Sequence, residues 1–354
     1  MLDPRNLAPE IFATRARELG AHDLSIRRLI AATVGQGIHD PLIWGREFQV
    51  PKRLRDAIAF PLPRLVLERS ITSPVDGFQK LLFRTYEGLA VETVLIPLHK
   101  TGAVSVCLSS QVGCPMGCVF CATARMMQRR NLETWEIIDQ LLQAREIVRR
   151  EGRRVTGAVF MGMGEPFLNY DRVLAAAELL RCPFGGAVAA QAITISTVGL
   201  VPEIDRFTLE RRRFRLAISL GAATDAKREQ LVPLAARTPV AEVMAAARRH
   251  SLARRDRVML AYVCIGGVNV DESDARALAD LIGDTAVRLD LIDVTDPTGR
   301  WHPPAPDEYR RFRDALACHL KQPVVRRYSG GADIEAACGT LAGTQFSAVR
   351  QRHS

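Results

Sequence analysis

Residues 107–121 read CLSSQVGCPMGCVFC, and within this stretch Cys114, Cys118 and Cys121 follow the spacing C-x3-C-x2-C. Thiolates spaced so closely can surround one compact soft-metal centre. Zinc fingers usually add a second C-x2-C pair or two histidines, whereas no second pair occurs here and no histidine lies nearby after His99. Three cysteines on a cubane [4Fe–4S] cluster would leave one iron without a protein ligand, open to a small molecule. The spacing favours such a cluster, with a cysteine-rich zinc site or three core thiols as alternatives.

From about residue 103 onward, short apolar stretches alternate with amphipathic ones. This alternation predicts parallel βαβ units with right-handed crossovers. Six apolar stretches predict an α/β fold with an open (β/α)6 partial TIM barrel, and a doubly wound sheet is the alternative. Ligands bind at the carboxyl ends of the strands in both folds, so the cysteines, which follow the first strand, are expected at the mouth of the barrel. The expected strands are 104–108, 156–162, 192–196, 214–220, 258–265 and 289–294.

The chain before residue 103 has a different pattern. Apolar positions at helical spacing predict helices in 9–20 and 23–35, and Pro51 is expected at the first position of another helix. Two alternating stretches within 80–98, joined by Glu87-Gly88, predict a hairpin. We therefore expect four segments: a small N-terminal helical module at 1–77 that resembles an RNA-binding domain, a hairpin and linker at 78–102, the barrel at 103–327, and a C-terminal loop at 328–354 that folds back.

The composition limits the possible partners and compartments. The chain has 354 residues, a formal net charge of +9 and eight cysteines. Arginine clusters such as RRRFR at 211–215 are typical of proteins that bind nucleic acid, although they are also common on solvated faces. No apolar stretch is long enough to predict a membrane span, and the N-terminus has no apolar signal sequence. We expect a cytoplasmic protein, in which cysteines serve metal or redox chemistry more often than structural disulfides.

Four further stretches accompany the cysteines, namely RNL at 130–132, MGMGEP at 161–166, ISTVGLVP at 195–202 and DIEAACGTLAG at 333–343. In this order, and together with CLSSQVGC, they resemble the RlmN and Cfr family of radical S-adenosylmethionine (SAM) RNA methyltransferases. The resemblance extends from about residue 78 to the C-terminal end. It implies that the partial barrel is a radical SAM core. It also implies two cofactors, a [4Fe–4S] cluster and SAM, with two molecules of SAM used in each turnover.

The resemblance assigns the metal and cofactor sites residue by residue. Cys114, Cys118 and Cys121 would hold the cluster, and SAM bound to the open iron would give a 5′-deoxyadenosyl radical after one-electron reduction. The GEP element fits a SAM site, because a glycine lets backbone approach the ligand and a carboxylate accepts hydrogen bonds from the SAM ammonium group. The positions that match SAM contacts in the family are Gly164, Glu165, Ser196, Ser219, Gly221 and Thr295.

The resemblance also implies two catalytic thiols and a general base. Cys338 matches the cysteine that the family methylates on itself before the carbon passes to adenine, whose carbon 2 is a poor nucleophile. Cys107 would then attack Cys338, release the product and leave a Cys107–Cys338 disulfide that must be reduced. Glu92 matches the glutamate that accepts a proton. Without the surrounding motifs, Glu92 would be interpreted as a carboxylate on the surface of a strand, and Cys338 would be interpreted as a small buried residue.

The sequence departs from the family in loops that would face SAM or substrate. Gly221 stands where the family usually has histidine, and Thr295 aligns with an asparagine that helps to hold SAM. Residues 330–333 read GGAD where Arg-Gly-Asp-Asp is usual, and residues 126–127 are methionines where glycine is more usual. The catalytic thiols, the glutamate and the cluster cysteines are intact. Carbon 8 of adenine is therefore an alternative target to carbon 2, and another RNA position is an alternative to the family's usual one.

We expect RNA (rRNA, tRNA or both) as the macromolecular partner, a one-electron reductant such as flavodoxin, no membrane association, and a monomer. The same chemistry could act on a small molecule or a peptide, although such a substrate needs neither a basic surface nor a docking module. A catalytically retired iron–sulfur protein could bind RNA, although binding alone needs neither Cys107 nor Cys338. Loss of activity on substitution of Cys338, with the cluster content unchanged, would distinguish the enzyme from the binding protein.

Overall fold

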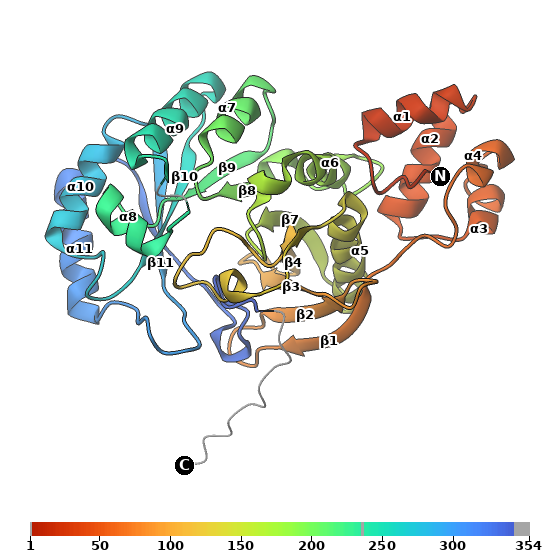
Figure 1. Ribbon diagram of the computed structural model, residues 1–354. Coiled ribbons are helices and arrows are strands. Elements are labelled where there is room, and N and C mark those ends of the chain that lie inside the picture. The colour runs from red at the N-terminus through yellow and green to blue at the C-terminus, as the bar shows by residue number, and fades with distance from the viewer. Residues whose placement is uncertain (1, 235–236, 343–354) are drawn as a thin grey trace, which may run out of the picture.

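The computed structural model describes residues 2–234 and 237–342, and its central element is a ten-stranded sheet (Figure 1). The strands neighbour each other in sequence order, β1-β2-β3-β4-β7-β8-β9-β10-β11-β12. Since β1 and β12 are the two edges, the sheet is open. The strands are β1 Val66–Thr72, β2 Gln79–Arg84, β3 Ala90–Pro97, β4 Ala103–Cys107, β7 Arg154–Phe160, β8 Ile193–Thr197, β9 Arg215–Ser219, β10 Val258–Cys264, β11 Val287–Asp293 and β12 Val324–Arg327.

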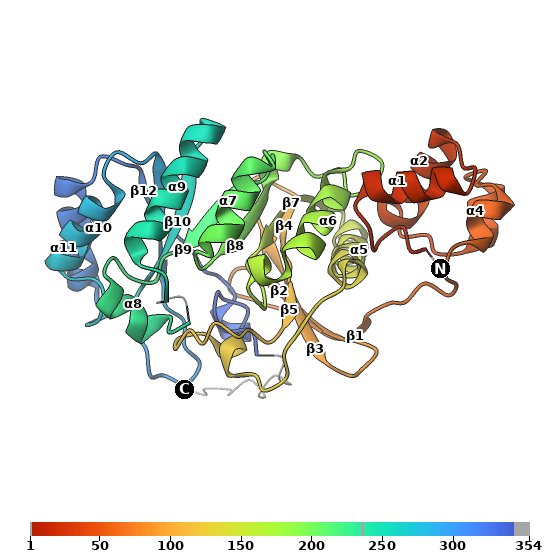
Figure 2. The same cartoon turned by 45° about the horizontal axis from the view of Figure 1, so that its top comes forward.

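The strands from β4 onward pair in parallel, and helices connect them on the outer face (Figure 2). A doubly wound sheet reverses its strand order at a switch point, whereas this order never reverses. The predicted partial barrel is thus confirmed, and the doubly wound alternative is wrong. The helices are α5 Thr134–Arg150, α6 Tyr170–Arg181, α7 Val201–Leu209, α8 Asp225–Leu231, α9 Val240–Arg254, α10 Glu272–Ile282 and α11 Pro306–His319.

All six predicted barrel strands are present, with β12 as an additional parallel strand that pairs with β11. The sequence VVRR of β12 is short and half of it is arginine, so it carried no apolar signal. Its position matters for the site, because the chain leaves β12 at the same edge of the sheet where the other parallel strands end.

An antiparallel meander extends the barrel sheet. The predicted hairpin is present as β2 and β3, and β3 pairs antiparallel with β4. The strand β1 pairs with β2 and lies inside the segment 1–77 that was expected to be helical. Almost all of β1 is exposed, as befits an edge strand, so its sequence does not show the alternation of a half-buried strand.

The N-terminal module is a group of short helices at one end of the sheet, beside α5 and α6 (Figure 1). The two predicted helices are α1 Pro9–Glu18 and α2 Asp23–Ile30, and a π-helical turn at Ala31–Gly35 continues α2. Two shorter helices follow, α3 Pro41–Arg46 and α4 Lys52–Asp56, and Pro51 is the N-cap of α4 instead of its first residue. Arg145 of α5 donates hydrogen bonds to the carbonyls of Val34 and Gly35 and so fastens the module to the barrel.

No helix in the described ranges is both long and apolar enough to cross a membrane.

Candidate active site

The carboxyl ends of the parallel strands open into a cavity of about 230 Å³. Eleven of the twelve residues singled out in the sequence line this cavity, and Glu92 is the exception. The lining residues among them are Cys107, Cys114, Cys118, Cys121, Gly164, Glu165, Ser196, Ser219, Gly221, Thr295 and Cys338. Residues that lie more than two hundred positions apart in the sequence thus meet at one site, as expected for the end of a barrel.

The three-cysteine loop follows β4 and crosses the mouth of the barrel. The backbone N–H of Val119 donates to the carbonyl of Leu231 at 3.1 Å, which ties the loop to α8. Burial raises the pKa of Cys114 to about 12, and burial together with the neighbouring thiols raises the pKa of Cys118 well above its ordinary value. Negative charge on these sulfurs therefore needs a positive partner, as a metal centre supplies.

Residues 2–234 and 237–342 contain no group of three His, Cys, Asp or Glu side chains already arranged around a single metal ion. The three thiols instead line one wall of the larger cavity. An all-sulfur donor set on one short loop is a typical cradle for an iron–sulfur cluster, and thiolates are its usual ligands. The residues present therefore fit such a cluster.

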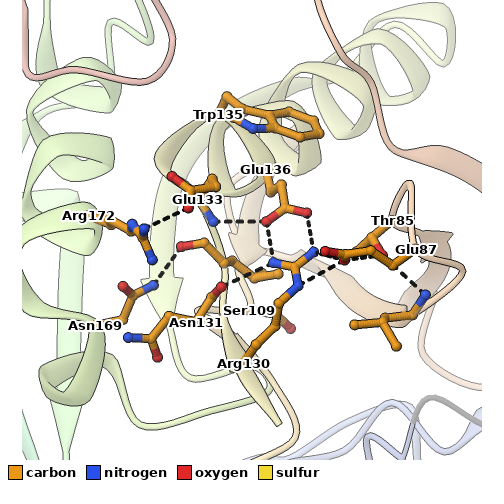
Figure 3. A network of polar contacts seen from close by, with 12 residues as sticks. Thr85, Glu87, Ser109, Arg130, Asn131, Glu133, Trp135, Glu136, Asn169 and Arg172 are labelled. Atoms are coloured by element: carbon orange, nitrogen blue, oxygen red, sulfur yellow. Dashed lines mark hydrogen bonds and ion pairs between the residues drawn. The ribbon is translucent and has the colours of Figure 1, made fainter. Parts of the chain in front are cut away.

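A network of polar contacts supports the far end of the cysteine loop (Figure 3). Arg130 donates from both terminal nitrogens to the carboxylate of Glu136, at 2.7 and 2.8 Å, and from one of them to Glu87 at 2.6 Å. Glu136 also accepts from the backbone N–H of Glu133, which completes the capping box of α5. The hydrogen bonds to Glu136 raise the pKa of Arg130. The RNL motif, which begins at Arg130, therefore fixes the loop to both α5 and the β2–β3 turn.

A second chain of amide contacts joins the motifs to one another. Gln111 donates to the side-chain oxygen of Asn131 at 2.7 Å and accepts from the backbone N–H of Glu165 at 2.7 Å. Asn169 donates to the carbonyls of Ser110 and Leu132 at 2.9 and 2.8 Å. These amides hold the CLSSQVGC, RNL and GEP segments in one frame. The sequence analysis did not single out Gln111 or Asn169, because their partners are distant in the chain.

Gly164 is required by this frame. Its φ is +102°, and a Cβ at this position would lie 2.6 Å from the Cβ of Gln111. The glycine of the GEP element therefore allows the close approach of Gln111, in addition to the ligand approach that was predicted for it.

Glu165 is almost completely buried at the wall of the cavity. Its carboxylate accepts hydrogen bonds from the backbone N–H groups of Phe167 and Val198, at 3.0 and 2.9 Å. Burial nevertheless raises the pKa of Glu165 to about 7. A carboxylate held in this way can attract a cationic group of a ligand, since its own desolvation is only partly compensated.

The other predicted SAM contacts lie along the ends of β8 to β11. Ser196 and Ser219 lie on neighbouring strands, with their hydroxyl oxygens 3.4 Å apart. Gly221 has a φ of +77°, and its carbonyl accepts a hydrogen bond from the fully buried Asn269 at 3.1 Å. The sequence analysis did not single out Asn269 either. Its hydrogen bond fixes the backbone at Gly221, the position where the family usually has histidine. Thr295 lines the cavity after β11.

The described part of the C-terminal loop, residues 328–342, folds back over the cavity and carries the exposed Cys338. The rest of the expected segment 328–354 lies outside the described residues. The backbone N–H of Cys338 donates to the hydroxyl of Ser329 at 2.9 Å. The loop is fastened to the cysteine loop by the hydrogen bond from Ala122 N–H to the carbonyl of Gly339, 2.7 Å long. The side chain of Lys80 holds the other side through the carbonyl of Glu335, at 2.9 Å.

Cys107 is the last residue of β4, and it lines the same cavity as Cys338 although the two residues are far apart in the sequence. Burial, and to a smaller extent the nearby Cys338, raises the pKa of Cys107 to about 12, although Arg327 opposes this shift. Both Cys107 and Cys338 are free thiols in this structure.

Comparisons with known proteins agree with this arrangement. The Radical SAM superfamily model matches residues 108–279. A "Probable RNA methyltransferase" of Myxococcus xanthus is 46% identical over 325 residues, which cover 91% of this chain and 89% of the relative. A "Dual-specificity RNA methyltransferase RlmN" of Anaeromyxobacter dehalogenans is 40% identical over 300 residues, which cover 83% and 80%. The chain belongs to the RlmN family of radical SAM methyltransferases.

A solved structure supports the same conclusion. The crystal structure of a radical SAM methyltransferase from Sphaerobacter thermophilus superimposes with a TM-score of 0.86 at 36% identity, and the match covers 96% of this chain and 99% of that one. As a radical SAM methyltransferase of the RlmN family, the protein uses a [4Fe–4S] cluster and SAM.

Glu92 occupies a different place from the other predicted residues of this RlmN-family site. It is buried in β3, and its Oε1 lies 3.4 Å from Nζ of Lys80, which is also buried. Burial lowers the pKa of Lys80, and the charge of Glu92 opposes that effect. The carboxylate thus lies behind the cavity wall, paired with the lysine that holds the Cys338 loop.

Proposed function

We propose that the protein methylates an adenine carbon of rRNA or tRNA, with Cys338 as the carrier of the transferred carbon. The observation that carries the proposal is the meeting of Cys107, Cys338 and the three-cysteine loop at one cavity. The relatives named as RNA methyltransferases and the net charge of +9 support RNA as the substrate class. Carbon 2 is the proposed target, and carbon 8 is the alternative.

In this proposal, Cys114, Cys118 and Cys121 hold the cluster, and the cluster with SAM supplies a methyl group and a hydrogen-abstracting radical. Glu165 and the serine pair Ser196 and Ser219 would bind polar groups of SAM from the strand ends. Gly164, Gly221 and Thr295 complete the same wall. The buried carboxylate of Glu165 provides the negative charge that the SAM ammonium group requires.

The two remaining thiols carry out the covalent chemistry. The thiolate sulfur of Cys338 accepts a methyl group, and after loss of one hydrogen atom its carbon forms a bond to the adenine ring. The adduct then loses one electron, for which the cluster would be the acceptor, and the proton of the ring carbon. The Cys107 thiolate then attacks the Cys338 sulfur, so a sulfur–sulfur bond forms while the sulfur–carbon bond breaks. The carbon keeps the bonding electron pair and takes up a proton, which leaves a methyl group on the base. Two electrons from an external thiol reductant restore both thiols. A one-electron donor such as flavodoxin would serve the cluster.

Proton removal from the adenine carbon is the role predicted for Glu92. That role stays a prediction, because the carboxylate lies outside the cavity lining and pairs with Lys80. The pairing supports a positioning role as well, since the same lysine holds the carbonyl of Glu335 in the Cys338 loop. We further propose that the protein acts as a monomer on RNA in the cytoplasm.

The decisive experiment uses a Cys107→Ala variant with its cluster intact, because this variant cannot release a base bound to Cys338. The purified protein is treated with nuclease and protease, and the Cys338 peptide is analysed by mass spectrometry. We expect a methylene-linked nucleotide on Cys338, and the double variant Cys107→Ala/Cys338→Ala as control should carry none. A methyl group alone would indicate an acceptor other than the host's RNA, and an unmodified Cys338 would contradict the proposed catalysis.

A further inference from the structure

Tyr328 is an exposed aromatic residue at the mouth of the cavity. It directly follows β12, lines the cavity and remains 69% exposed. An exposed tyrosine is not unusual by itself. This one is unusual because its ring is held in place while its surface is left open.

Two contacts fix the ring, and a third holds the carboxylate to which its hydroxyl donates. The hydroxyl of Tyr328 donates to Oδ2 of Asp76 at 2.8 Å, and the edge of the ring meets Phe78 with centroids 6.2 Å apart and an interplanar angle of 79°. The backbone N–H of Gly331 donates to the same oxygen of Asp76 at 2.8 Å. Burial opposes ionisation of Asp76, but the bonds from Gly331 and Tyr328 hold its pKa below the ordinary value.

The glycines after Tyr328 allow this arrangement. A Cβ on Gly330 would lie 2.4 Å from the ring of Phe78 and 2.6 Å from Oδ2 of Asp76. The departure from arginine at this position therefore lets the loop press against the β1–β2 turn. The turn in return holds Tyr328 in a single orientation.

The residue that follows Tyr328 contacts the backbone of Cys338. Ser329, the next residue, accepts the hydrogen bond from the backbone N–H of Cys338 at 2.9 Å. On the other side, Arg327 lines the cavity and donates from a terminal nitrogen to the sulfur of Met161 at 3.3 Å. The aromatic ring of Tyr328, the guanidinium group of Arg327 and the thiol of Cys338 thus all belong to residues that line the cavity.

We propose that Tyr328 is a stacking platform for a nucleobase next to the adenine that is modified. This inference rests on the proposed function and names a binding site within it. Single-stranded nucleic acid is bound sequence-tolerantly by aromatic rings on which bases stack, together with nearby cations. A ring that is already fixed loses little rotamer freedom when the base binds, so its orientation favours affinity.

The test compares Tyr328→Ser, which removes the ring, with Tyr328→Phe, which keeps the ring and removes the bond to Asp76. Tyr86, which is 98% exposed and does not line the cavity, provides the matched control Tyr86→Ser. Two quantities are measured for each protein: SAM-dependent methylation of Cys338 without RNA, and the KM and kcat for total RNA from cells that lack the enzyme.

We expect Tyr328→Ser to methylate Cys338 to the wild-type extent and to show a KM for RNA raised about tenfold or more. Tyr328→Phe and Tyr86→Ser should stay within about threefold of the wild type. If Tyr328→Ser had the wild-type KM for RNA, this result would overturn the inference and leave the proposed function unaffected. Equal losses in the Ser and Phe variants, or loss of Cys338 methylation, would also overturn it, because the hydroxyl would then matter only for holding the loop. If the wild-type enzyme methylated no RNA, this result would contradict the proposed function and, with it, the role of Tyr328.

Discussion

Ala122 and Gly339 are joined by a backbone hydrogen bond 2.7 Å long, and each residue directly follows a cysteine of the site. Ala122 follows the last cysteine of the three-cysteine loop, and Gly339 follows Cys338. Thr123 adds a hydrogen bond from its hydroxyl to the carbonyl of Leu341 at 2.5 Å. The segment proposed to hold the cluster and the segment proposed to carry the methyl group are therefore one connected structure, although more than two hundred residues separate them.

This connection predicts that loss of the cluster loosens the Cys338 loop. Hydrogen–deuterium exchange is measured by mass spectrometry on the cluster-loaded protein and on the apoprotein. We expect amides of residues 329–342 to exchange on the order of tenfold faster without the cluster, because the cysteine loop no longer supports them. Amides of α10, remote from the cysteine loop, provide the internal control. Equal exchange of residues 329–342 in the two states would contradict the coupling.

The buried pair of Lys80 and Glu92 predicts strong coupling in stability. Removal of one partner takes away an opposite charge 3.4 Å from the buried group that remains, so Lys80→Met should lower the free energy of unfolding by about 3–5 kcal/mol. The double variant Lys80→Met/Glu92→Leu should recover part of this loss. Urea unfolding of the apoprotein measures each value. A double-mutant cycle on the exposed pair of Arg150 and Glu146 is the matched control. Its coupling free energy should be about 0.5 kcal/mol or less. Additive effects of the two buried substitutions would show that the pair does not act as a unit.

Glu165 predicts a pH dependence of SAM binding. Its pKa is raised to about 7 by burial, so below this pH the carboxyl group is mostly protonated in the free protein. A bound ammonium group favours the carboxylate, so binding releases a proton. The affinity for SAM should therefore rise as the pH rises towards about 7 and level off above it. Titration calorimetry in two buffers of different ionisation enthalpy would detect the released proton. In Glu165→Gln, binding should be weaker and its dependence around this pH should disappear; an affinity that falls with rising pH would show the assignment to be wrong.

Substitution by alanine should lower the free energy of unfolding by different amounts at Gly164 and Gly267. Both have a positive φ, +102° and +68°, but a Cβ on Gly164 would overlap Gln111, whereas nothing lies within 4 Å of one on Gly267. Gly267→Ala should cost about 1 kcal/mol from backbone strain alone, and Gly164→Ala should cost more and also weaken SAM binding. Thermal unfolding and SAM titration of the two variants provide the comparison. Equal costs would mean that Gln111 moves aside freely.

The local signals in the sequence were sufficient to predict the barrel and the three-cysteine loop, whereas the other predicted site residues came from a resemblance to a family. The spacing of Cys114, Cys118 and Cys121 predicted a soft-metal cradle, and the alternation of apolar strands with amphipathic helices predicted the sheet that the structure shows. These signals are local because ligand spacing and side-chain periodicity are properties of neighbouring residues. The roles of Cys107 and Cys338 came from a resemblance, since neither residue has a local pattern of its own.

The tertiary structure decided what no local pattern can contain. The exposed edge strand β1 and the arginine-rich β12 lack periodicity because their environments are set by neighbouring strands. Gln111, Asn169 and Asn269 act through partners that the fold brings to them, and the interior position of Glu92 depends on Lys80 from another strand. The open, fixed ring of Tyr328 depends on Asp76 in a distant turn. The cysteine spacing thus indicated a soft-metal centre, whereas contacts between distant segments, formed only in the folded sheet, placed the groups that surround the cavity.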